Sequence, residues 1–281
     1  MKTPNVGWRA ETIVPDRILL FVPCYNCAPQ IGRVLGRIKG EIAAHIDEVL
    51  VLDNGSRDGT VDAAIAAASK VRVKRVTVAR NRDNYNLGGS HKAAYAYAGK
   101  HGFTHVVTLH GDDQGDVNDL LPLFKSGKHR TNDACMGARF IKGSHLNNYS
   151  TFRVIGNRVF NAIFSLAARK GITDLGSGLN VLARSAFLDP RIKRLPDDLY
   201  FNPYLLLDLI GAGRSVHFFP ISWREEDQVS NVKMASQALR TLRAPFLFTF
   251  ARKRFGQMDF RSRKRRSYRF DVIADIVPKR A

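Results

Sequence analysis

Several side chains able to bind a metal ion crowd into the stretch LHGDDQGD, which spans residues 109–116. The stretch contains His110, Asp112, Asp113 and Asp116, and it directly follows a short apolar run. Neighbouring carboxylates repel one another, and a bound dication removes that repulsion. Mg²⁺ and Mn²⁺ prefer carboxylate oxygens, and Mg²⁺ usually shares its coordination shell with substrate phosphates. The stretch therefore predicts a divalent-cation site, with a plain acidic turn as the alternative.

Two other polar segments also follow apolar runs. Asp53 closes the run EVLVLD, where a carboxylate can accept hydrogen bonds from a ribose or a base, although DNGS is also ordinary turn chemistry. The segment 86–94, NLGGSHKAA, combines two glycines with a helix start, so backbone N–H groups and Lys92 could face a phosphate. Gly-Ser before a helix is equally an ordinary cap. No G-x-G-x-x-G follows the first strand, which disfavours a dinucleotide-dependent oxidoreductase.

Alternating strands and helices must position these segments. Branched apolar runs predict strands and periodic runs between them predict helices: strands at 17–23, 48–53, 73–79 and 105–109, and helices at 30–42, 60–70 and 90–102. Such β-α-β units form a mainly parallel sheet, and right-handed crossovers bring the strand ends to one edge. The motifs at Pro23, Asp53 and His110 all follow strand ends, where open α/β sheets bind ligands.

The alternation weakens after about residue 130. The remaining predicted elements are a strand at 134–140, an amphipathic helix at 153–171, a short strand and helix start within 174–188, a helix at 202–214 and a strand at 215–223. The section 252–269 then holds nine Lys or Arg residues and one acid, Asp259. A basic segment interleaved with aromatic residues suits a membrane surface with anionic headgroups. A solvated basic tail is the alternative.

Composition narrows the partners and the compartment. The 281 residues carry 44 Lys and Arg against 25 Asp and Glu, a net charge of +19, which favours an anionic partner such as a nucleic acid, a phosphorylated substrate or an anionic membrane. No signal-peptide pattern opens the sequence, and no apolar run reaches the roughly 18–20 residues that a spanning helix needs. Three cysteines indicate reduced thiols, with a redox role for Cys24 and Cys27 as the alternative.

Six motifs in order give the chain a recognisable pattern. VPCYN, LDNGSRDGT, NLGGSHKAA, HGDDQGD, DLGSGLN and ISWREEDQVSN, with GARF between the fourth and fifth, resemble family-2 nucleotide-sugar glycosyltransferases of GT-A fold. The resemblance is nearest to the polyprenyl-phosphate branch, similar to dolichol-phosphate mannosyltransferases, and it extends from about residue 17 to 233. It implies an N-terminal extension at 1–16, a glycosyltransferase domain at 17–233 and a basic amphipathic C-terminal segment at 234–281.

The resemblance also implies roles for individual residues. Those expected to bind the nucleotide-sugar are Pro23, Tyr25, Asn26, Asp53, Ser56, Gly88, Lys92 and Gln114. Those expected at the acceptor phosphate are Arg139, Ser177, Arg224 and Ser230. Those expected to act in catalysis are Asp112, Asp174 and Arg224. The expected metal ligands are Asp112, His110 and Asp113, for Mg²⁺ or Mn²⁺.

The sequence departs from the family pattern at several of these positions. His110 stands at the first Asp of D-x-D, Cys27 where an acid is common, Asn54 at a second Asp, and Asn180 at an Arg. Imidazole ligates Mn²⁺ more readily than Mg²⁺. The alternative for His110 is a hydrogen bond to a neighbour.

The resemblance implies inverting transfer from a UDP- or GDP-sugar, with a polyprenyl phosphate as the expected acceptor. The oxygen of such a phosphate is already an anionic nucleophile, whereas a saccharide hydroxyl would need a carboxylate base. The base candidates are Asp174, Asp197 and Asp198. We expect a cytoplasmic protein attached peripherally to the inner face of the membrane. The other classes considered are a nucleotide-sugar binder without turnover and a nucleic-acid-binding protein, which the acidic cluster disfavours.

Overall fold

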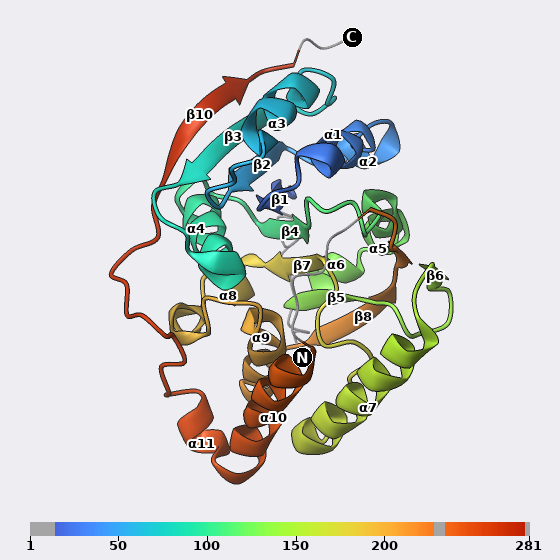
Figure 1. The fold of residues 1–281 in the computed structure, drawn as a ribbon, viewed down its shortest axis with the longest axis vertical. Helices are drawn as coiled ribbons and strands as arrows, with labels where there is room; N and C mark the ends of the chain where they lie inside the picture. The colour runs from blue at the N-terminus through green and yellow to red at the C-terminus, as the bar shows by residue number, and fades with distance from the viewer. Residues whose placement is uncertain (1–14, 228–233, 279–281) are drawn as a thin grey trace, which may run out of the picture.

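An eight-stranded sheet forms the centre of the protein, with helices on both of its faces (Figure 1). The computed structural model describes residues 15–227 and 234–278. The strand order is β10-β3-β2-β1-β4-β7-β5-β8. Strands β1, β2, β3 and β4 are mutually parallel, and β5 and β8 run parallel to each other. Strand β7 is antiparallel to both β4 and β5, and β10 is antiparallel to β3, so the expected mainly parallel sheet is confirmed.

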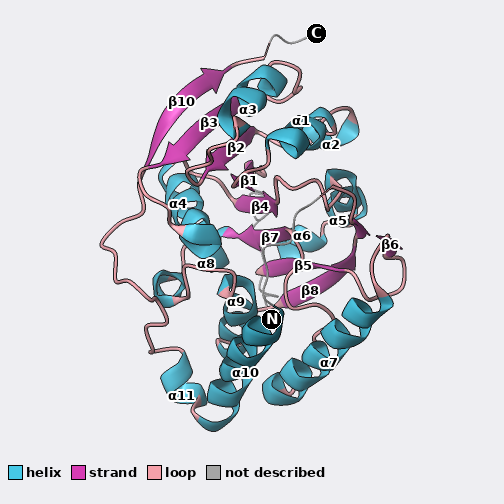
Figure 2. Cartoon of the chain, in the orientation of Figure 1, coloured by secondary structure: helices cyan, strands magenta, loops and turns pink. Residues whose placement is uncertain are grey.

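The first half of the chain builds the parallel part of the sheet, with helices between its strands (Figure 2). Its elements are β1 (Ile18–Cys24), α1 (Ala28–Gly36), α2 (Glu41–Ala44), β2 (Glu48–Asp53), α3 (Thr60–Ala68), β3 (Arg75–Asn81), α4 (Asn86–Lys100), β4 (His105–Leu109), α5 (Leu121–Lys125) and α6 (Lys128–Thr131). A 3-10 turn, Val117–Leu120, precedes α5. The four expected strands are present in the expected order.

The second half completes the sheet and adds three longer helices. Its elements are β5 (Ala134–Ala138), β6 (His145–Asn147), α7 (Thr151–Ala168), β7 (Leu179–Ala183), α8 (Arg184–Phe187), α9 (Phe201–Gly211), β8 (Val216–Pro220), β9 (Ser222–Arg224), α10 (Met234–Phe250), α11 (Arg252–Phe255) and β10 (Phe270–Ile276). A second 3-10 turn spans Pro190–Arg194. The short strands β6 and β9 form a separate parallel pair.

Two local predictions needed correction. The helix expected at 30–42 is divided into α1 and α2, because the chain turns at Gly40 with φ of +62°, a conformation that glycine adopts easily. Helix α4 begins at Asn86, four residues before the expected start, so the glycines of NLGG lie in its first turn.

The C-terminal segment is part of the sheet. Strand β10 pairs with the edge strand β3 from Phe270 to Ile276, and Figure 1 shows it at the outer edge of the sheet. The segment 234–281, which we expected to form an amphipathic extension, therefore includes β10, a strand of the central sheet. The alternation of polar and apolar residues in FDVIADI is typical of a half-exposed strand, and this pattern could have predicted β10.

Two apolar cores lie on opposite faces of the sheet, because successive strand residues point to opposite sides. In β1, Leu20 and Val22 join the core beneath α1 and α3, whereas Leu19 and Phe21 join the core beneath α4 and α9. Within the described residues, no helix has the length and hydrophobicity needed to cross a membrane. The sheet thus presents the carboxyl ends of β1 to β5 along one rigid edge, where the predicted motifs lie.

Candidate functional site

His110 follows β4 directly, and its imidazole lies against the backbone of Gly178. The backbone N–H of His110 donates to the backbone carbonyl of Gly178 at 2.9 Å. A Cβ on Gly178 would lie 2.8 Å from the imidazole Cγ. The imidazole Nε2 is buried and has no hydrogen-bond partner among the described residues. Burial lowers the pKa of His110, so the ring is neutral at pH 7 and one of its nitrogens keeps a lone pair.

Asp112 and Gln114 lie on the loop that follows. The Asp112 carboxylate accepts the backbone N–H of Gln114 at 3.2 Å. The Gln114 carbonyl accepts the backbone N–H of Arg224 at 3.0 Å, which ties this loop to β9. The Arg224 guanidinium lies 3.3 Å from the Asp116 carboxylate. The structure therefore brings three of the predicted residues, Asp112, Gln114 and Arg224, into one small region.

Asp113 has a different environment from Asp112. Its carboxylate is 1% exposed and is bound by Arg33 at 2.8 Å and by Arg37. The backbone φ of Asp113 is +63°, so the chain turns sharply directly after Asp112. Two guanidinium groups already neutralise this carboxylate, which makes Asp113 a weaker candidate for the metal shell than Asp112. The crowding of acids in LHGDDQGD is thus relieved partly by arginines from the first helix and the turn after it.

The donor set at the end of β4 suits a cation shared with a substrate. The described residues contain no group of three or more His, Cys, Asp or Glu side chains placed to hold a metal ion by themselves. Mg²⁺ is commonly held by one or two protein carboxylates, with phosphate oxygens completing its shell. Asp112 with the unpartnered His110 nitrogen fits that arrangement, and the nitrogen favours Mn²⁺.

The ends of β1 and β2 form a second part of the same edge. The N–H of Asn26 donates to the Ser56 hydroxyl at 2.8 Å, and the Asn26 side chain accepts the N–H of Arg57 at 3.1 Å. Asp53 is fully buried and caps the turn by accepting the N–H of Ser56 at 3.1 Å. Tyr25 is 54% exposed beside this turn. Among the predicted donor-site residues, Tyr25 therefore offers an exposed aromatic ring to a ligand base.

Asp53 also has a partner that the sequence analysis missed. The Arg80 guanidinium, from the end of β3, donates to the Asp53 carboxylate at 2.8 Å. Together with the turn N–H groups, it occupies the oxygens that the resemblance assigns to a ribose or a base. Pro23 lies at the carboxyl end of β1, and its carbonyl accepts the N–H of Gly111 at 3.1 Å, which joins the donor-side turn to the His110 loop.

Asn54 explains why an amide replaces the second acid of the family motif. Its amide oxygen accepts from Asn81 and from the N–H of Tyr85, each at 2.9 Å. Its amide nitrogen donates to the Asn84 side chain at 2.8 Å. A carboxylate could accept the first two bonds but could not donate the third. Asn54 therefore fixes the turn after β2 to the turn after β3.

Gly88 and Lys92 are both buried in the protein interior. A Cβ on Gly88 would lie 2.4 Å from the Pro196 carbonyl oxygen, so glycine here allows α4 to approach the chain before α9 closely. The Lys92 ammonium is buried, lies 2.6 Å from the Asp197 carboxylate and donates to the Leu195 carbonyl at 2.5 Å. Both residues have structural roles in the described contacts, and their predicted contacts with the nucleotide remain predictions.

Arg139, expected at the acceptor phosphate, and Asp174, expected in catalysis, bind each other. The guanidinium donates to both carboxylate oxygens, each at 2.8 Å, and both side chains are largely buried. The Arg139 guanidinium also lies over the Trp223 ring at 5.0 Å. The Ser177 hydroxyl is fully buried and donates to the Gly137 carbonyl at 2.8 Å. Ser230 lies outside the described residues.

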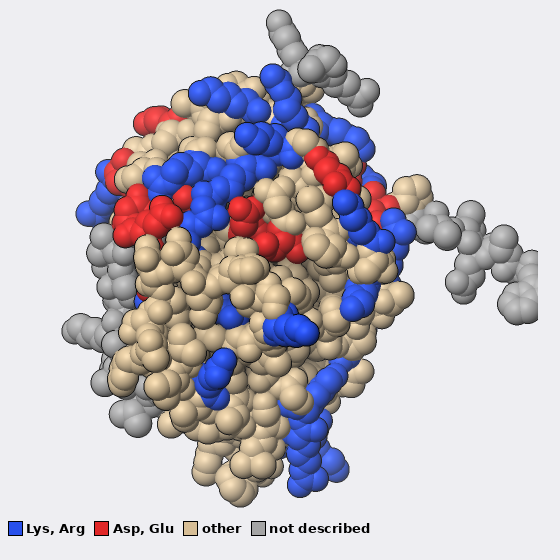
Figure 3. Space-filling model, turned by 90° about the vertical axis from the view of Figure 1, so that its right-hand side faces the viewer, with Lys and Arg blue, Asp and Glu red and all other residues tan. Residues whose placement is uncertain are grey.

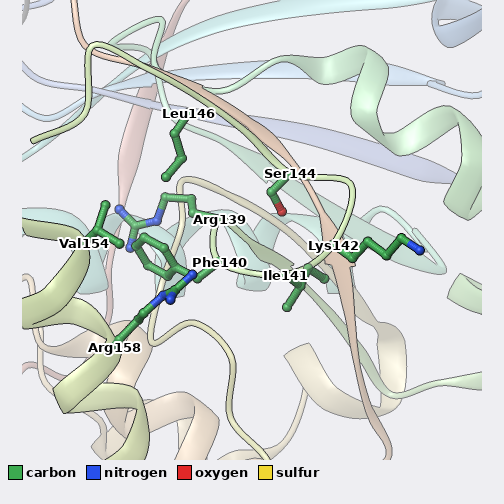
Figure 4. Close-up of a pocket in the computed structure, with 8 residues that line it drawn as sticks. All are labelled: Arg139, Phe140, Ile141, Lys142, Ser144, Leu146, Val154 and Arg158. Carbon is green, nitrogen blue, oxygen red and sulfur yellow. The ribbon is translucent and has the colours of Figure 1, made fainter. Parts of the chain in front are cut away.

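Two pockets open beside this buried pair. The larger, about 430 Å³, is lined by Arg139, Phe140, Ile141, Lys142, Ser144, Leu146, Val154 and Arg158. Figure 4 shows Arg139, Phe140, Val154 and Arg158 together at one side of it, with Lys142 at the opposite side. The smaller, about 240 Å³, is lined by His145, Asn147, Ser222, Trp223, Arg224 and Glu226. Both pockets offer cations to a ligand, and the larger adds apolar walls.

The three candidate bases differ in their surroundings. Asp174 is held by Arg139, and Asp197 is held by Lys92 and by the Tyr268 hydroxyl at 2.7 Å. Asp198 is only partly buried and accepts the N–H of Tyr200 at 3.0 Å. Burial raises the pKa of Asp198, which is the direction that a general base working near neutral pH needs.

The paired thiols do not fit a redox site. Cys24 and Cys27 are both buried, and the neighbouring Cys27 thiol, together with burial, raises the pKa of Cys24 well above its ordinary value. Reactive thiols have lowered pKa values and solvent access. The sulfur atoms instead fill space against Gly111, where a Cβ would lie 2.7 Å from the Cys24 Sγ.

The sequence matches a known family over more than half of its length. Residues 20–189 match the model of glycosyl transferase family 2. The glycosyltransferase AglJ of Haloferax volcanii is 28% identical over 179 residues, which cover 62% of this chain and 53% of that protein. The chain thus spans about half the length of this curated relative.

Solved structures share the fold at low sequence identity. Glucosyl-3-phosphoglycerate synthase from Mycobacterium tuberculosis, in complex with UDP, is 16% identical with a TM-score of 0.58, covering 82% of this chain and 79% of that one. The same enzyme with Mn²⁺, UDP-glucose and phosphoglyceric acid gives a TM-score of 0.59, at 83% and 79% coverage. These matches confirm the expected α/β fold of GT-A type, and the family match shows that the chain belongs to glycosyltransferase family 2.

Proposed function

We propose that this family-2 glycosyltransferase transfers a sugar from a UDP- or GDP-sugar to a polyprenyl phosphate, with a divalent cation at the end of β4. The observation that carries the donor side is the buried, unpartnered Nε2 of His110, two residues before the Asp112 carboxylate on the loop at the ligand edge of the sheet. When bound there, Mn²⁺ or Mg²⁺ supplies positive charge to the departing nucleoside diphosphate. Structures of the mycobacterial synthase hold Mn²⁺ with UDP-glucose, and Mg²⁺ with UDP, which supports the choice of ions.

The chain's own residues have separate tasks in this reaction. The exposed Tyr25 ring offers a surface on which the nucleotide base can stack. An oxygen of the acceptor phosphate attacks the anomeric carbon as the bond from that carbon to the diphosphate oxygen breaks, and the diphosphate leaves with the electron pair. The attack comes from the side opposite the leaving group, so the anomeric configuration inverts. No proton has to be removed from an acceptor that is already ionised.

The larger pocket supports a phosphate acceptor with an apolar tail. Lys142 and Arg158 line it, and neither forms an ion pair with another described residue. Phe140, Ile141 and Leu146 give it apolar walls. A phosphate needs the cations and an isoprenoid chain needs the walls. Arg139, already bound to Asp174, shapes the pocket and lends it positive potential.

A hydroxyl acceptor is the second candidate, and the environment of Asp198 favours it. Its raised pKa suits a general base, and the mycobacterial synthase was solved with phosphoglyceric acid. For this acceptor, the Asp198 carboxylate would take the hydroxyl proton during transfer. Asp198→Asn separates the candidates, since it should abolish transfer to a hydroxyl and leave transfer to a phosphate nearly unchanged.

The test is a donor screen with UDP- and GDP-sugars and either cation. Each donor is offered undecaprenyl phosphate, dolichyl phosphate or phosphoglyceric acid as the acceptor. We expect release of the nucleoside diphosphate with the lipid phosphates, and its loss in the Lys142→Ala/Arg158→Ala double variant. Turnover with phosphoglyceric acid, and with neither lipid phosphate, would overturn the lipid-phosphate assignment. Donor binding without turnover, for every acceptor, would favour a binder without catalytic activity.

A further inference from the structure

The outer face of α7 carries an apolar stripe that no described element covers. Its members are Phe152, Ile155, Val159, Ile163 and Leu166, spaced by three or four residues and therefore aligned along one side of the helix. Phe152 is 74% exposed and Leu166 is 82% exposed. Surface apolar residues are common singly, whereas a continuous stripe of five marks an interaction surface.

The opposite face of the same helix is already used by the core. Phe164 and Ala168 pack into the apolar core on the α4 side of the sheet, and Asn161 is also buried. Helix α7 is therefore apolar on two faces, which differs from the single apolar side expected from the sequence. A solvated surface helix needs only one. The second face needs a partner outside the described chain.

Helix α10, a neighbour of α7, carries exposed apolar side chains of its own. It contacts α7, and Figure 1 shows the two helices side by side at one end of the molecule. Phe246 and Phe250 of α10 are 62% and 75% exposed, and their rings lie 4.9 Å apart. We call these two residues and the five of α7 the α7–α10 surface.

Positive charge surrounds the α7–α10 surface. Residues 139–173 include six Lys or Arg and no acid, and residues 228–258 likewise contain no acid. Two of these six, Arg139 and Arg153, are paired with Asp174 and Glu225, so the other four, Lys142, Arg158, Arg169 and Lys170, carry the positive charge. Arg158, Arg169 and Lys170 are exposed on α7 and just beyond its end. In Figure 3, the lower part of the face that carries α7 is uncharged surface with scattered Lys and Arg and without Asp or Glu. Apolar side chains bordered by cations match a bilayer with anionic headgroups.

Other parts of the molecule and other occupants fit less well. Within the basic section 252–269, where we expected membrane contact, Arg261 is paired with Asp259 and Arg265 with Asp83. A second copy of this chain would bring the cations around one α7–α10 surface against those of the other, which is unfavourable without intervening acids.

We propose that the α7–α10 surface docks on a lipid bilayer containing anionic lipids, with α7 lying in the headgroup region. Val154 and Arg158 of α7 also line the larger pocket, so docking would hold that pocket at the membrane. The inference deepens the proposed lipid-phosphate acceptor and rests on it for its purpose. Its evidence, the exposed stripe and the charge around it, is independent of the donor site.

The test is sedimentation of the full chain with vesicles. The vesicles are phosphatidylcholine alone or phosphatidylcholine mixed with phosphatidylglycerol. We expect binding to the mixed vesicles only, and a fall of about a hundredfold for Phe152→Ser/Leu166→Ser, since each of the two lost side chains contributes on the order of a tenfold change in partition. The matched control is Val272→Ser/Ile273→Ser on β10, where both side chains are half-exposed, and it should bind as the wild type does.

The outcomes separate this inference from the proposed function. Equal binding by wild type and Phe152→Ser/Leu166→Ser, or no binding by the wild type, overturns the inference. A dimer in solution that this double variant converts to a monomer, without vesicle binding, also overturns it and assigns the surface to a second copy. Vesicle binding that follows the prediction, in a protein that never turns over a nucleotide-sugar, leaves the inference standing and defeats the proposed function alone.

Discussion

At the residue scale, Asn54 shows how a departure from the family motif serves the fold. Its amide oxygen accepts from Asn81 and Tyr85 and its nitrogen donates to Asn84. Asn54→Asp would set a carboxylate against the Asn84 oxygen, because that oxygen already accepts the N–H of Asn86. We expect a loss of about 1–3 kcal/mol in the free energy of unfolding.

Urea denaturation of the variant measures this loss. Asn147→Asp is the matched control, because Asn147 is exposed on β6 and should lose little stability. An unchanged unfolding midpoint for Asn54→Asp would mean that the Asn54 amide does not tie the two turns together.

As the proposed nitrogen ligand, His110 should set the preference among metals. Imidazole suits Mn²⁺ better than Mg²⁺, so wild-type turnover should be higher with Mn²⁺. His110→Asp restores the carboxylate of the family motif and should shift the ratio of Mn²⁺-supported to Mg²⁺-supported turnover by about tenfold toward Mg²⁺, a change of roughly 1.4 kcal/mol. A ratio that is the same in both proteins would remove His110 from the metal shell.

The position of a site residue in the fold was predictable from the sequence where the residue follows the end of a strand. The strand pattern placed Asp53, His110 and Asp112 at one sheet edge, and the topology confirms that placement. Which of these side chains face a ligand was not predictable. That depends on partners distant in the sequence, such as Arg80 for Asp53, and on contacts between side chains that spacing does not encode.

At the element scale, a buried ion pair fastens α4 to two other segments. Lys92 of α4 binds Asp197, before α9, and Asp197 also accepts from the Tyr268 hydroxyl in the segment before β10. Asp197→Ala would leave a buried ammonium without its counter-charge. We expect a loss of about 3–5 kcal/mol in the free energy of unfolding.

The matched control is a more exposed ion pair within the central sheet. Asp275 of β10 pairs with Arg75 of β3, and both side chains are about two-fifths exposed. Asp275→Ala should cost less than about 1 kcal/mol. Denaturant curves for both variants check the contrast, and equal losses would contradict the structural role assigned to Lys92.

Helix α9 should make stability depend on pH through Asp208. Burial raises the pKa of this carboxyl to about 6 from its ordinary 3.8. The folded chain therefore keeps this proton up to about pH 6, and the stabilising contribution of the protonated form is complete below 3.8 and lost as pH rises through 6. Asp208→Asn should match the wild type near pH 4 and gain up to about 3 kcal/mol near pH 8.

Asp189 provides a comparison of opposite sign. Hydrogen bonds and charge from Arg191, together with Arg214, outweigh burial and lower the pKa of Asp189 to about 2. Its contribution is present above 3.8 and lost as pH falls through 2. Asp189→Asn should therefore destabilise the protein at neutral pH. Thermal unfolding of the wild type and both variants between about pH 2 and pH 8 tests both signs. A stability difference between Asp208→Asn and the wild type that does not change with pH would refute the prediction for Asp208.

Sequence periodicity predicted most elements and missed those that depend on tertiary pairing. The four parallel strands, α3, α7 and α9 follow from apolar spacing alone. The division of the first helix depends on one glycine, and β10 depends on a partner strand nearly 200 residues earlier in the chain. The exposure of the second face of α7 was likewise not predictable, since a sequence pattern does not show which of two apolar faces packs.

At the scale of the whole molecule, charge and topology divide the surface between two partners. The carboxyl ends of the parallel strands meet at one edge, which holds His110, Asp112 and the turns after β1 and β2. The α7–α10 surface, with its bordering cations, lies at one end of the molecule. If the two proposals hold, a net charge of +19 suits a phosphorylated donor, a phosphorylated acceptor and an anionic bilayer, without requiring a nucleic acid.

The central claim is that Asp112 holds a divalent cation against the donor diphosphate. Isothermal titration of UDP and GDP, with and without Mn²⁺, tests it most directly in the wild type, Asp112→Asn and the matched variant Asp116→Asn. We predict that Mn²⁺ tightens nucleotide binding at least about tenfold in the wild type and in Asp116→Asn, and that this gain disappears in Asp112→Asn. A gain from Mn²⁺ that survives in Asp112→Asn would contradict the account.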